Sequence, residues 1–394
     1  RQAMGMPGAT PACAAVVPPA GCVVELHGLE GRSDLNGFRG VSLGQAAEEL
    51  RIKGRVGVRL DQAGEISVGP SRATAVFAIQ EVPGKGFGVV AQLPLKAGDL
   101  LVRETPALLG RLGETPDNRQ VKAWSAAQRE AVLALYDAYA DASGETTLEG
   151  IVSTNALPRD SHSDETVLCV LASRFNHSCA PNAEYLWAKE TGLEEVRAVR
   201  DIPPGDEVCV NYFGDAIRHP RSTRQAQLRE GFRFDCRCSA CMFPASASDD
   251  RRSRLMALEQ EILQCRERPA EGLRLVEEAL ELMRQENISA PRTVAQFCND
   301  GFELALLLDD PEEVQTWAHM SFESHRLGWG DNDPMTRRML HYVQHPPSLA
   351  APVARAPGSS PEPAESSAPL LVKPEAAGPP GSGVGEVRDG WLAS

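Results

Sequence analysis

Short apolar runs separated by glycine turns characterise the chain between residues 22 and 72. Val23–Leu29 and Glu65–Val68 are rich in β-branched and aliphatic residues, which favour strands. Between these runs, Asn36 and Gly37 form a dipeptide that is typical of tight hairpin turns. We therefore expect residues 22–72 to form a small β-barrel module.

Residues 73–245 combine short apolar segments, glycine turns and one stretch with helical periodicity. Apolar residues in Trp124–Ala142 recur at the spacing of a helix face, which predicts one helix here. The residues expected on its buried face are Val132, Leu135, Tyr136 and Tyr139. Strands and a helix within one segment predict a mixed α+β domain.

The pattern from residue 246 to residue 345 is helical throughout. Two apolar stripes at helical spacing predict helices that pack as successive hairpins. Asp310-Pro311 and Asp333-Pro334 each predict a helix start, because Asp caps free N–H groups and Pro fits the first turn. The stripe residues are Leu255, Leu258, Ile262 and Leu263 in the first helix, and Leu273, Val276, Leu280 and Met283 in the second.

Both ends of the chain are rich in Ala, Pro and Gly. Residues 1–21 show no hydrophobic periodicity, and residues 346–394 contain 10 Pro and 6 Gly. Such segments bury too little apolar surface to offset their ordering entropy, so we expect both to be disordered. Because the chain begins with Arg1, we expect the natural N-terminus to lie upstream.

Composition narrows the possible functions. The chain has 394 residues, of which 42% are hydrophobic, and this suits two or three globular domains. Its net charge of −14 opposes non-specific nucleic-acid binding, which needs a basic face, and favours contact with basic protein segments. No run approaches the roughly 18 apolar residues of a membrane span. We therefore expect a protein partner, and neither direct nucleic-acid binding nor membrane binding.

Cysteine is too sparse for a disulfide scaffold, since the chain has 10 Cys, so we expect a reducing compartment, cytoplasmic or nuclear or both. Three of them, Cys236, Cys238 and Cys241, place three thiolates around one small volume. Tetrahedral zinc needs a fourth ligand, for which Cys179 in an unusually polar loop is our candidate. The alternative is three reduced cysteines in a loop, although their Asp, Arg and Ser neighbours do not suit apolar burial.

Three further segments have polar or glycine-rich patterns. Gly84–Gly88 lets a ligand approach the backbone closely, although by itself it is more typical of a strand connection. Ala172–Asn182 contains Asn-His-Ser-Cys-Ala-Pro-Asn, which suits a fixed loop better than a helix or a central strand. Gly205–Tyr212 predicts a turn followed by a strand that ends at Tyr212.

Taken together and in this order, the three segments and the Cys-x-Cys-x-x-Cys motif resemble a SET-domain protein lysine methyltransferase with a post-SET zinc site. The resemblance covers residues 73–245. Ser153-Thr154-Asn155-Ala156 and the helical C-terminal region are similar to the SET-and-MYND and fungal-type SET proteins. The sequence has no Cys/His-rich MYND finger motif, so the roles of that finger are not carried over.

The resemblance implies a fold and a set of site residues. The fold would be a set of small β-sheets in which the chain threads through a loop as a pseudoknot. Tyr212 would be the active-site tyrosine, in a substrate channel with Leu157 and Phe232. Cys179, Cys236, Cys238 and Cys241 would bind structural zinc. The residues expected to bind or flank S-adenosylmethionine are Lys85, Gly86, Phe87, Gly88, Asn155, Ser173, Asn176, His177 and Phe234.

Two channel positions depart from the family pattern. Relatives often carry Tyr where this chain has Phe232, and an aromatic residue where it has Leu157. Loss of a channel hydroxyl would change the number of methyl groups added or weaken catalysis, and the sequence leaves both outcomes open. Tyr185 is a candidate for a replacement hydroxyl.

The leading hypothesis is therefore a monomeric enzyme that methylates a lysine of a histone or non-histone protein. Its helical region is expected to form one wall of a substrate cleft. The rival hypothesis is a catalytically weak SET-fold protein that binds a partner through this cleft and the helices. A third hypothesis, a hydrolase using His177 and Cys179, is disfavoured because two residues so close on one loop rarely align as base and nucleophile.

Overall fold

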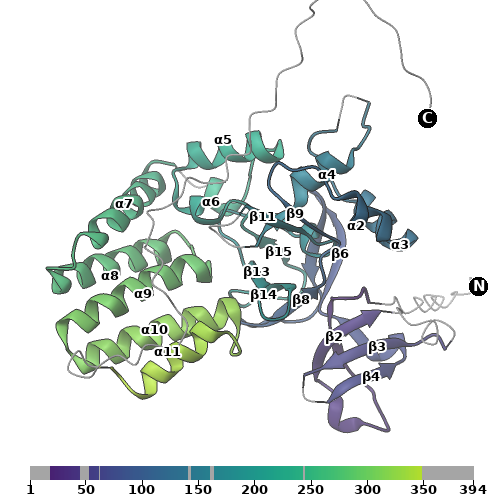
Figure 1. Cartoon of the computed structure of the whole chain (residues 1–394), viewed down its shortest axis with the longest axis horizontal. Coiled ribbons are helices and arrows are strands. Elements are labelled where there is room, and N and C mark those ends of the chain that lie inside the picture. The colour runs from purple at the N-terminus through teal and green to yellow at the C-terminus, as the bar shows by residue number, and fades with distance from the viewer. Residues whose placement is uncertain are drawn as a thin grey trace, which may run out of the picture.

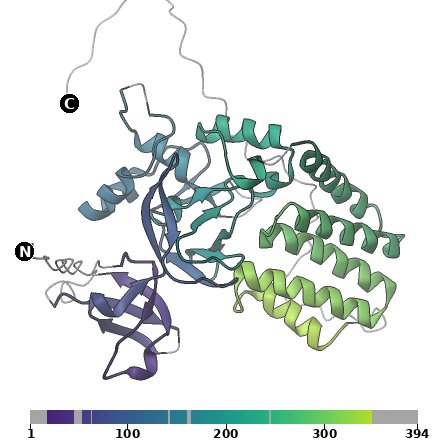
Figure 2. The ribbon, with the colours of Figure 1, turned by 180° about the vertical axis from the view of Figure 1, so that it is seen from behind.

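The protein has three parts that follow one another along the chain (Figure 1). A β-sheet module at the N-terminus and a curved array of helices at the C-terminus lie on either side of a central α+β domain, as the view from behind also shows (Figure 2). The computed structural model describes residues 18–44, 53–61, 63–140, 143–159, 164–242 and 245–347.

The N-terminal module is one antiparallel sheet with strand order β4-β3-β2-β1-β5. In the described part of this module, the outer strands β4 and β5 are not paired with each other, so closure into a barrel stays a prediction. The last strand extends the module beyond the expected boundary at residue 72. The strands are β1 (Val23–Leu26), β2 (Arg39–Gly44), β3 (Val56–Leu60), β4 (Gly64–Val68) and β5 (Ala73–Ala75).

The start of this module corrects one end of the predicted disorder. Residues 18–21 are described and structured: the Gly21 N–H donates to the Ser42 carbonyl, and the Ser42 hydroxyl donates to the Pro18 carbonyl. Residues 1–17 and 348–394, the remainder of the two segments predicted to be disordered apart from Pro346 and Pro347, lie outside the described residues.

The central domain contains three small sheets around one apolar core. The first has the order β12-β15-β7-β6, the second β13-β14-β8 and the third β10-β11-β9. The strands are β6 (Phe77–Val82), β7 (Gly86–Ala91), β8 (Leu100–Glu104), β9 (Leu108–Arg111), β10 (Leu157–Pro158), β11 (Glu165–Leu168), β12 (Asn176–His177), β13 (Ala183–Ala188), β14 (Leu193–Ala198) and β15 (Glu207–Val210).

One strand pair in the first sheet is parallel. β12 runs beside β15, so that Asn176 lies opposite Cys209 and His177 opposite Val210. The other two strand pairs in this sheet are antiparallel. Parallel pairing needs a long crossover, and here residues 178–206 supply it. The polar loop is thereby placed beside the strand that leads to Tyr212.

The helix predicted over Trp124–Ala142 is wrong in its second half. In the described part of this segment the structure has one short helix, α3 (Ala126–Leu133), which lies between α2 (Asn118–Ala123) and α4 (Leu148–Asn155) along the chain. The chain leaves the helix because the Asp137 carboxylate accepts hydrogen bonds from the backbone N–H groups of Tyr139 and Thr147. Tyr136, expected on the buried face, is consequently exposed.

The C-terminal region is helical, as predicted. Asp310 and Asp333 cap the starts of two helices through their side chains. The stripe residues are buried or partly buried except Leu263, which is exposed near the end of its helix. The helices are α5 (Arg221–Phe232), α6 (Ser239–Met242), α7 (Ala245–Leu263), α8 (Pro269–Gln285), α9 (Pro291–Leu308), α10 (Pro311–Trp329) and α11 (Pro334–Gln344).

Consecutive helices from α8 to α11 pack on one another around a single apolar core. The tightest contact joins α9 and α10, where the Trp317 ring leaves no room for a Cβ atom at Gly301. Trp317 is buried and packs between the two helices. In the described part of the chain, no helix is both long enough and apolar enough to cross a membrane.

A buried carboxyl lies between the strands of the second sheet. Glu194 is opposite Trp187 on β13 and Glu104 on β8, and it is fully buried. The Glu104 carboxylate accepts hydrogen bonds from the N–H groups of Val170, Leu171 and Ala172, whereas neither Glu194 oxygen has a partner in the described structure. Burial raises the pKa of Glu194 well above its ordinary value.

We expect Glu194→Gln to stabilise the protein more at pH 8 than at pH 5. In the unfolded chain Glu194 ionises near its ordinary pKa, whereas the folded protein retains the proton, so stability falls as the pH rises. Gln does not ionise and avoids this loss, which we expect to be on the order of 1–3 kcal/mol at pH 8. Urea unfolding at both pH values measures the difference. Glu190→Gln, at an exposed turn, is the control, and an equal effect of Glu194→Gln at both pH values would contradict the interpretation.

Candidate functional site

A single asparagine fixes the polar loop against β15. The Asn182 side-chain amide donates to the Glu207 carbonyl at 2.9 Å, and its oxygen accepts from the Cys209 N–H at 2.7 Å. The Asn182 side chain therefore pairs with one C=O group and one N–H group of β15, as the backbone of a neighbouring strand would. The loop of residues 172–182 is held as a fixed structure, as the sequence predicts.

Glu207 joins two of the segments expected to bind cofactor. One carboxylate oxygen lies 2.5 Å from Lys85 Nζ, and the other accepts from Asn176 Nδ2 at 2.9 Å. Burial disfavours the Lys85 ammonium, but its hydrogen bond with Glu207 and the neighbouring negative charges outweigh this, so the pKa of Lys85 is raised. Asn176 also donates to the Phe87 carbonyl at 3.3 Å. Together these contacts hold the glycine-rich hairpin beside the polar loop.

The glycines in this hairpin have different roles. Gly86 has φ of +72°, a left-handed conformation that favours glycine, and the space where a Cβ atom would lie is open. Gly88 packs so tightly that a Cβ atom there would overlap Asn176 Nδ2 at 2.5 Å. The Phe87 ring is 64% exposed. The hairpin therefore presents backbone, rather than a packed side chain, to whatever binds there.

His177 and Tyr212 are in direct contact. The Tyr212 N–H donates to His177 Nδ1 at 3.2 Å, and the two ring centroids are 5.2 Å apart. Burial lowers the pKa of His177 to about 3, so its imidazole is neutral at physiological pH. The Tyr212 hydroxyl donates to the Phe175 carbonyl at 2.7 Å, and burial raises its pKa. Tyr212 therefore retains its proton and presents an oxygen in a fixed position.

Aromatic rings surround this pair on the side of α5. Phe232 lies 4.9 Å from Tyr212, Phe234 lies 6.5 Å from it edge-on, and Phe213 lies 4.8 Å from His177. Leu157 and Tyr185 pack against the same apolar core as Tyr212. The predicted channel residues are thus gathered in one apolar region.

Tyr139, from the segment between α3 and α4, contacts the end of α5. The Tyr139 hydroxyl donates to the Gly231 carbonyl at 3.0 Å, and the Arg233 guanidinium lies 5.3 Å from the Tyr139 ring centroid. Arg233 has φ of 60°, which is uncommon for a residue with a side chain. These contacts hold the turn between Phe232 and Phe234 in place.

Asn155 and Ser173 adjoin each other at the end of α4. The Asn155 side-chain amide donates to the carbonyls of Tyr136 and Ile151, both at 2.7 Å. Both hydrogens of its nitrogen are therefore used in hydrogen bonds within the protein. The Ser173 hydroxyl donates to the Cys169 carbonyl at 2.5 Å and lies 3.4 Å from the Asn155 carbonyl. The polar side-chain groups of both residues bond to the protein backbone, and their predicted contact with the cofactor stays a prediction.

Four cysteines from two distant segments meet in one cluster. The sulfur atoms of Cys179, Cys236, Cys238 and Cys241 all lie within 4.8 Å of one another, and those of Cys179 and Cys241 are 3.6 Å apart. Zn–S bonds of about 2.3 Å in a tetrahedron would place sulfur atoms roughly 3.8 Å apart. The cluster therefore has the ligand type, number and spacing that zinc requires.

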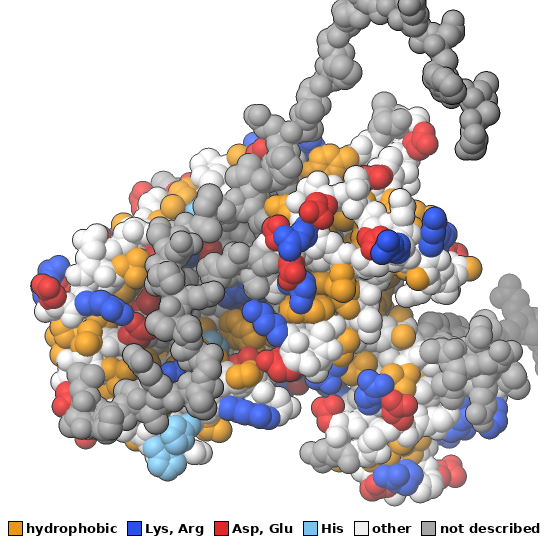
Figure 3. Space-filling model, viewed as in Figure 1, with side chains coloured by type: hydrophobic (Ala, Val, Ile, Leu, Met, Phe, Trp, Pro, Cys, Tyr) orange, Lys and Arg blue, Asp and Glu red, His pale blue; other side chains and the backbone are white. Residues whose placement is uncertain are grey.

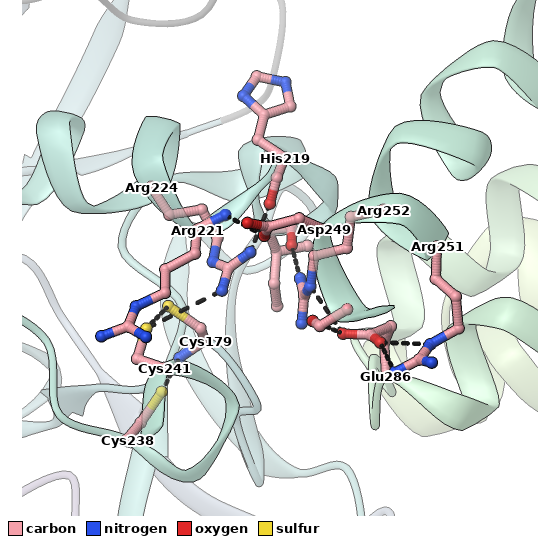
Figure 4. A network of polar contacts seen from close by, with 12 residues as sticks. Cys179, His219, Arg221, Arg224, Cys238, Cys241, Asp249, Arg251, Arg252 and Glu286 are labelled. Atoms are coloured by element: carbon pink, nitrogen blue, oxygen red, sulfur yellow. Dashed lines mark hydrogen bonds and ion pairs between the residues drawn. The ribbon is translucent and has the colours of Figure 1, made fainter. Parts of the chain in front are cut away.

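Backbone N–H groups and two side chains of α5 support the cluster. Cys179 N–H donates to the sulfur of Cys238, whose own N–H donates to the sulfur of Cys236. Gln225 binds the Cys236 backbone with both its oxygen and its nitrogen, at 3.0 and 2.7 Å. Arg224, also on α5, points at the cluster and donates to the Cys241 sulfur at 3.9 Å (Figure 4). Such outer contacts orient metal ligands in known sites.

Comparison with protein families identifies the central domain. The model of the SET domain family matches residues 86–213, from the glycine-rich hairpin to the residue after Tyr212. The chain contains a SET domain. The recognition made from the sequence is confirmed, and the cysteines at 236–241 lie just beyond the matched residues.

Known relatives of this SET domain are lysine methyltransferases by name. "Histone-lysine N-methyltransferase set5" of Schizosaccharomyces pombe is 26% identical over 282 residues, which are 70% of this chain and 86% of that protein. "Protein-lysine N-trimethyltransferase SMYD5" of Homo sapiens is 42% identical over 80 residues, which are 20% of this chain and 19% of that protein. "N-lysine methyltransferase SMYD2" of Rattus norvegicus is 43% identical over 67 residues, covering 17% and 14% respectively. Over its SET domain the chain is thus similar to set5 and to the SET-and-MYND methyltransferases.

Two residues that matter in this geometry were missed by the sequence analysis. Glu207 appeared only as part of a turn and strand, although a carboxylate at the start of a buried strand is itself a signal. Arg224 gave no signal, because it is one of several polar residues in α5 and its burial depends on the position of the cysteine cluster.

Proposed function

We propose that this protein transfers a methyl group from S-adenosylmethionine to a lysine side chain of a protein substrate. The observation that carries the proposal is the contact of Tyr212 with His177 and with the Phe232 ring, inside a SET domain. The names of the relatives support lysine methylation in general. The donor and the residue roles are our proposal.

The residues present suit S-adenosylmethionine. The open space at Gly86 and the exposed residues 85–87 offer a cradle that a side chain at position 86 would fill. Asn176, neutral His177 and the Phe234 ring border this region. When bound, this cofactor supplies the methyl group on a positively charged sulfur. Lys85, Ser173 and Asn155 would contribute through the backbone or by flanking the site.

The residues of the channel would favour the neutral form of the substrate lysine amine and orient it. An ammonium has no lone pair, so the amine must lose its proton, and an apolar channel favours the neutral form by desolvation. Tyr212 retains its proton and is tied to the Phe175 carbonyl, so its oxygen can orient the amine but is poorly suited as a base. Water would carry the proton away. The protein's contribution is alignment and exclusion of bulk water.

The channel lacks one hydroxyl at Phe232, and Tyr185 is the candidate to replace it. Tyr185 packs against the same core as Tyr212, and burial raises its pKa. A hydroxyl in this region would compete for space with added methyl groups and so influence their number.

The cysteine cluster would hold structural zinc. Four thiolates leave no open position for a substrate, so the metal would join the segment after the SET domain to the polar loop. We also infer that the parallel β12–β15 pair belongs to the threaded pseudoknot that the family resemblance implies, with the helical region as one wall of the cleft.

The substrate would be a basic protein segment, histone or non-histone, since the chain carries a net charge of −14. Figure 3 shows hydrophobic side chains, with acidic and basic ones beside them, around the hollow between the helical region and the central domain. We propose a monomer that acts in the cytoplasm, the nucleus or both, without direct nucleic-acid or membrane contact. The second candidate, a partner-binding protein with weak catalysis, is favoured only by Phe232 and Leu157.

The proposal predicts that the chain binds S-adenosylmethionine, that Asn176 contributes to this affinity, and that Tyr212 contributes to methyl transfer. Calorimetry with S-adenosylmethionine should show binding by the unmodified chain. Asn176→Ala should weaken it about tenfold or more, because the bonds to Phe87 and Glu207 are lost. Tyr212→Phe should keep cofactor affinity but lower methyl transfer to a peptide array by on the order of 100-fold. No binding at millimolar cofactor would favour the partner-binding alternative.

Glu207→Gln should raise the KM for S-adenosylmethionine about three- to tenfold with little change in kcat. The substitution removes the charge that holds Lys85 while keeping an oxygen for Asn176. Steady-state kinetics at varied S-adenosylmethionine concentration measures KM and kcat separately. Glu65→Gln on exposed β4 is the matched control. A loss confined to kcat would contradict a positioning role for Glu207.

The protein should contain one equivalent of zinc by elemental analysis. Cys238→Ser should lose the metal and the folded segment around residues 236–241, because the sulfur of Cys238 also accepts the Cys179 N–H. Cys298→Ser, at a buried cysteine in α9, is the control and should keep its zinc. Unchanged zinc content in Cys238→Ser would refute the assigned ligands.

A further inference from the structure

Arg224 is a buried cation beside the cysteine cluster. Its side chain is fully buried and is among the largest such side chains in the described structure. One terminal nitrogen donates to the His219 carbonyl, and the other donates to the Cys241 sulfur at 3.9 Å. The remaining nitrogen, Nε, is buried without a hydrogen-bond partner in the described structure. Figure 4 shows the guanidinium between these two contacts.

The charge of Arg224 has no carboxylate partner within ion-pair distance among the described residues. Two other buried arginines nearby do have one, since Arg218 pairs with Glu259 at 3.3 Å and Arg252 pairs with Glu286 at 2.8 Å. Burying an unpaired guanidinium costs several kcal/mol, and arginine does not shed its proton to avoid the cost. Arg224 therefore requires a different anionic group.

The sulfur atoms of the cluster are that group. A zinc ion held by four thiolates has a net charge of about −2, spread over its sulfur atoms. We propose that Arg224 is the counter-ion of the zinc–thiolate cluster, and that metal binding thereby anchors helix α7 to the SET domain. This inference rests on the zinc site of the proposed function and is independent of methyl transfer.

The link to α7 passes through the segment of residues 217–221. The Arg224 guanidinium, which faces the cysteine cluster, donates a hydrogen bond to the His219 carbonyl. From the other side, Arg252 of α7 donates to the Ile217 carbonyl, and Asp249 of α7 accepts from the Arg221 N–H at 2.6 Å. Without the metal, Arg224 would lose its counter-charge, and the segment would lose its anchor on that side.

The first test measures zinc affinity in the full chain by competition with a chromogenic chelator. Arg224→Met, which removes the charge and keeps most of the apolar volume, should raise the zinc Kd on the order of 10–100-fold. Arg224→Lys should fall between Arg224→Met and the unmodified chain. Arg218→Met, which removes a buried arginine paired with a carboxylate, should change the Kd by no more than about threefold.

Two results would overturn the proposal. One is an Arg224→Met protein whose zinc Kd lies within about threefold of the unmodified chain. The other is an Arg218→Met protein weakened as much as Arg224→Met, which would indicate general destabilisation. Absence of zinc from the unmodified chain would instead refute the metal site itself, whereas zinc retained without methyl transfer would contradict only the catalytic proposal.

A second test needs no variant and so does not depend on folding of Arg224→Met. Hydrogen exchange of the unmodified chain, with zinc and after its removal, should show faster exchange by about tenfold or more in α7. The N-terminal sheet, which has its own apolar core, is the internal control and should be unchanged. Equal exchange in α7 with and without zinc, or equal acceleration in both regions, would overturn the link.

Discussion

The parallel pairing of β12 with β15 is the contact on which the site depends. It places Asn176 and His177 beside β15, which ends two residues before Tyr212, and the Asn182 side chain adds two hydrogen bonds to the β15 backbone. A parallel pair of two residues is weak by itself, since each residue contributes few ladder bonds. Side chains therefore stabilise it: Asn182 on one side, and Glu207 with Lys85 on the other.

A second constraint acts over a longer distance in the chain. The cysteine cluster joins Cys179 in the polar loop to Cys236, Cys238 and Cys241 after α5. A metal at this position would act as a cross-link across nearly sixty residues, which restricts the unfolded chain as well as fixing the folded one. Because Phe232 and Phe234, whose rings lie beside Tyr212, directly precede these cysteines, such a cross-link would also help to fix the two rings.

Polar residues in this protein are buried where separate chain segments meet. Glu207 joins the hairpin to the loop, Arg224 joins α5 to the cysteines, and Glu194 lies unpaired between strands. Such groups contribute little to stability unless their partners are in place. Their value is to specify one arrangement of neighbouring segments.

Local patterns in the sequence were sufficient for the helix starts at Asp310 and Asp333 and for the strand leading to Tyr212, because those features depend on neighbouring residues. The order of motifs was also sufficient to recognise the SET domain. Local pattern failed over Trp124–Ala142, where Asp137 accepts from the N–H groups of Tyr139 and of Thr147, ten residues further along the chain, and it gave no sign of Arg224. Only the tertiary structure decided these, because a buried polar side chain takes its role from its hydrogen-bond partners, which hydrophobic periodicity does not indicate.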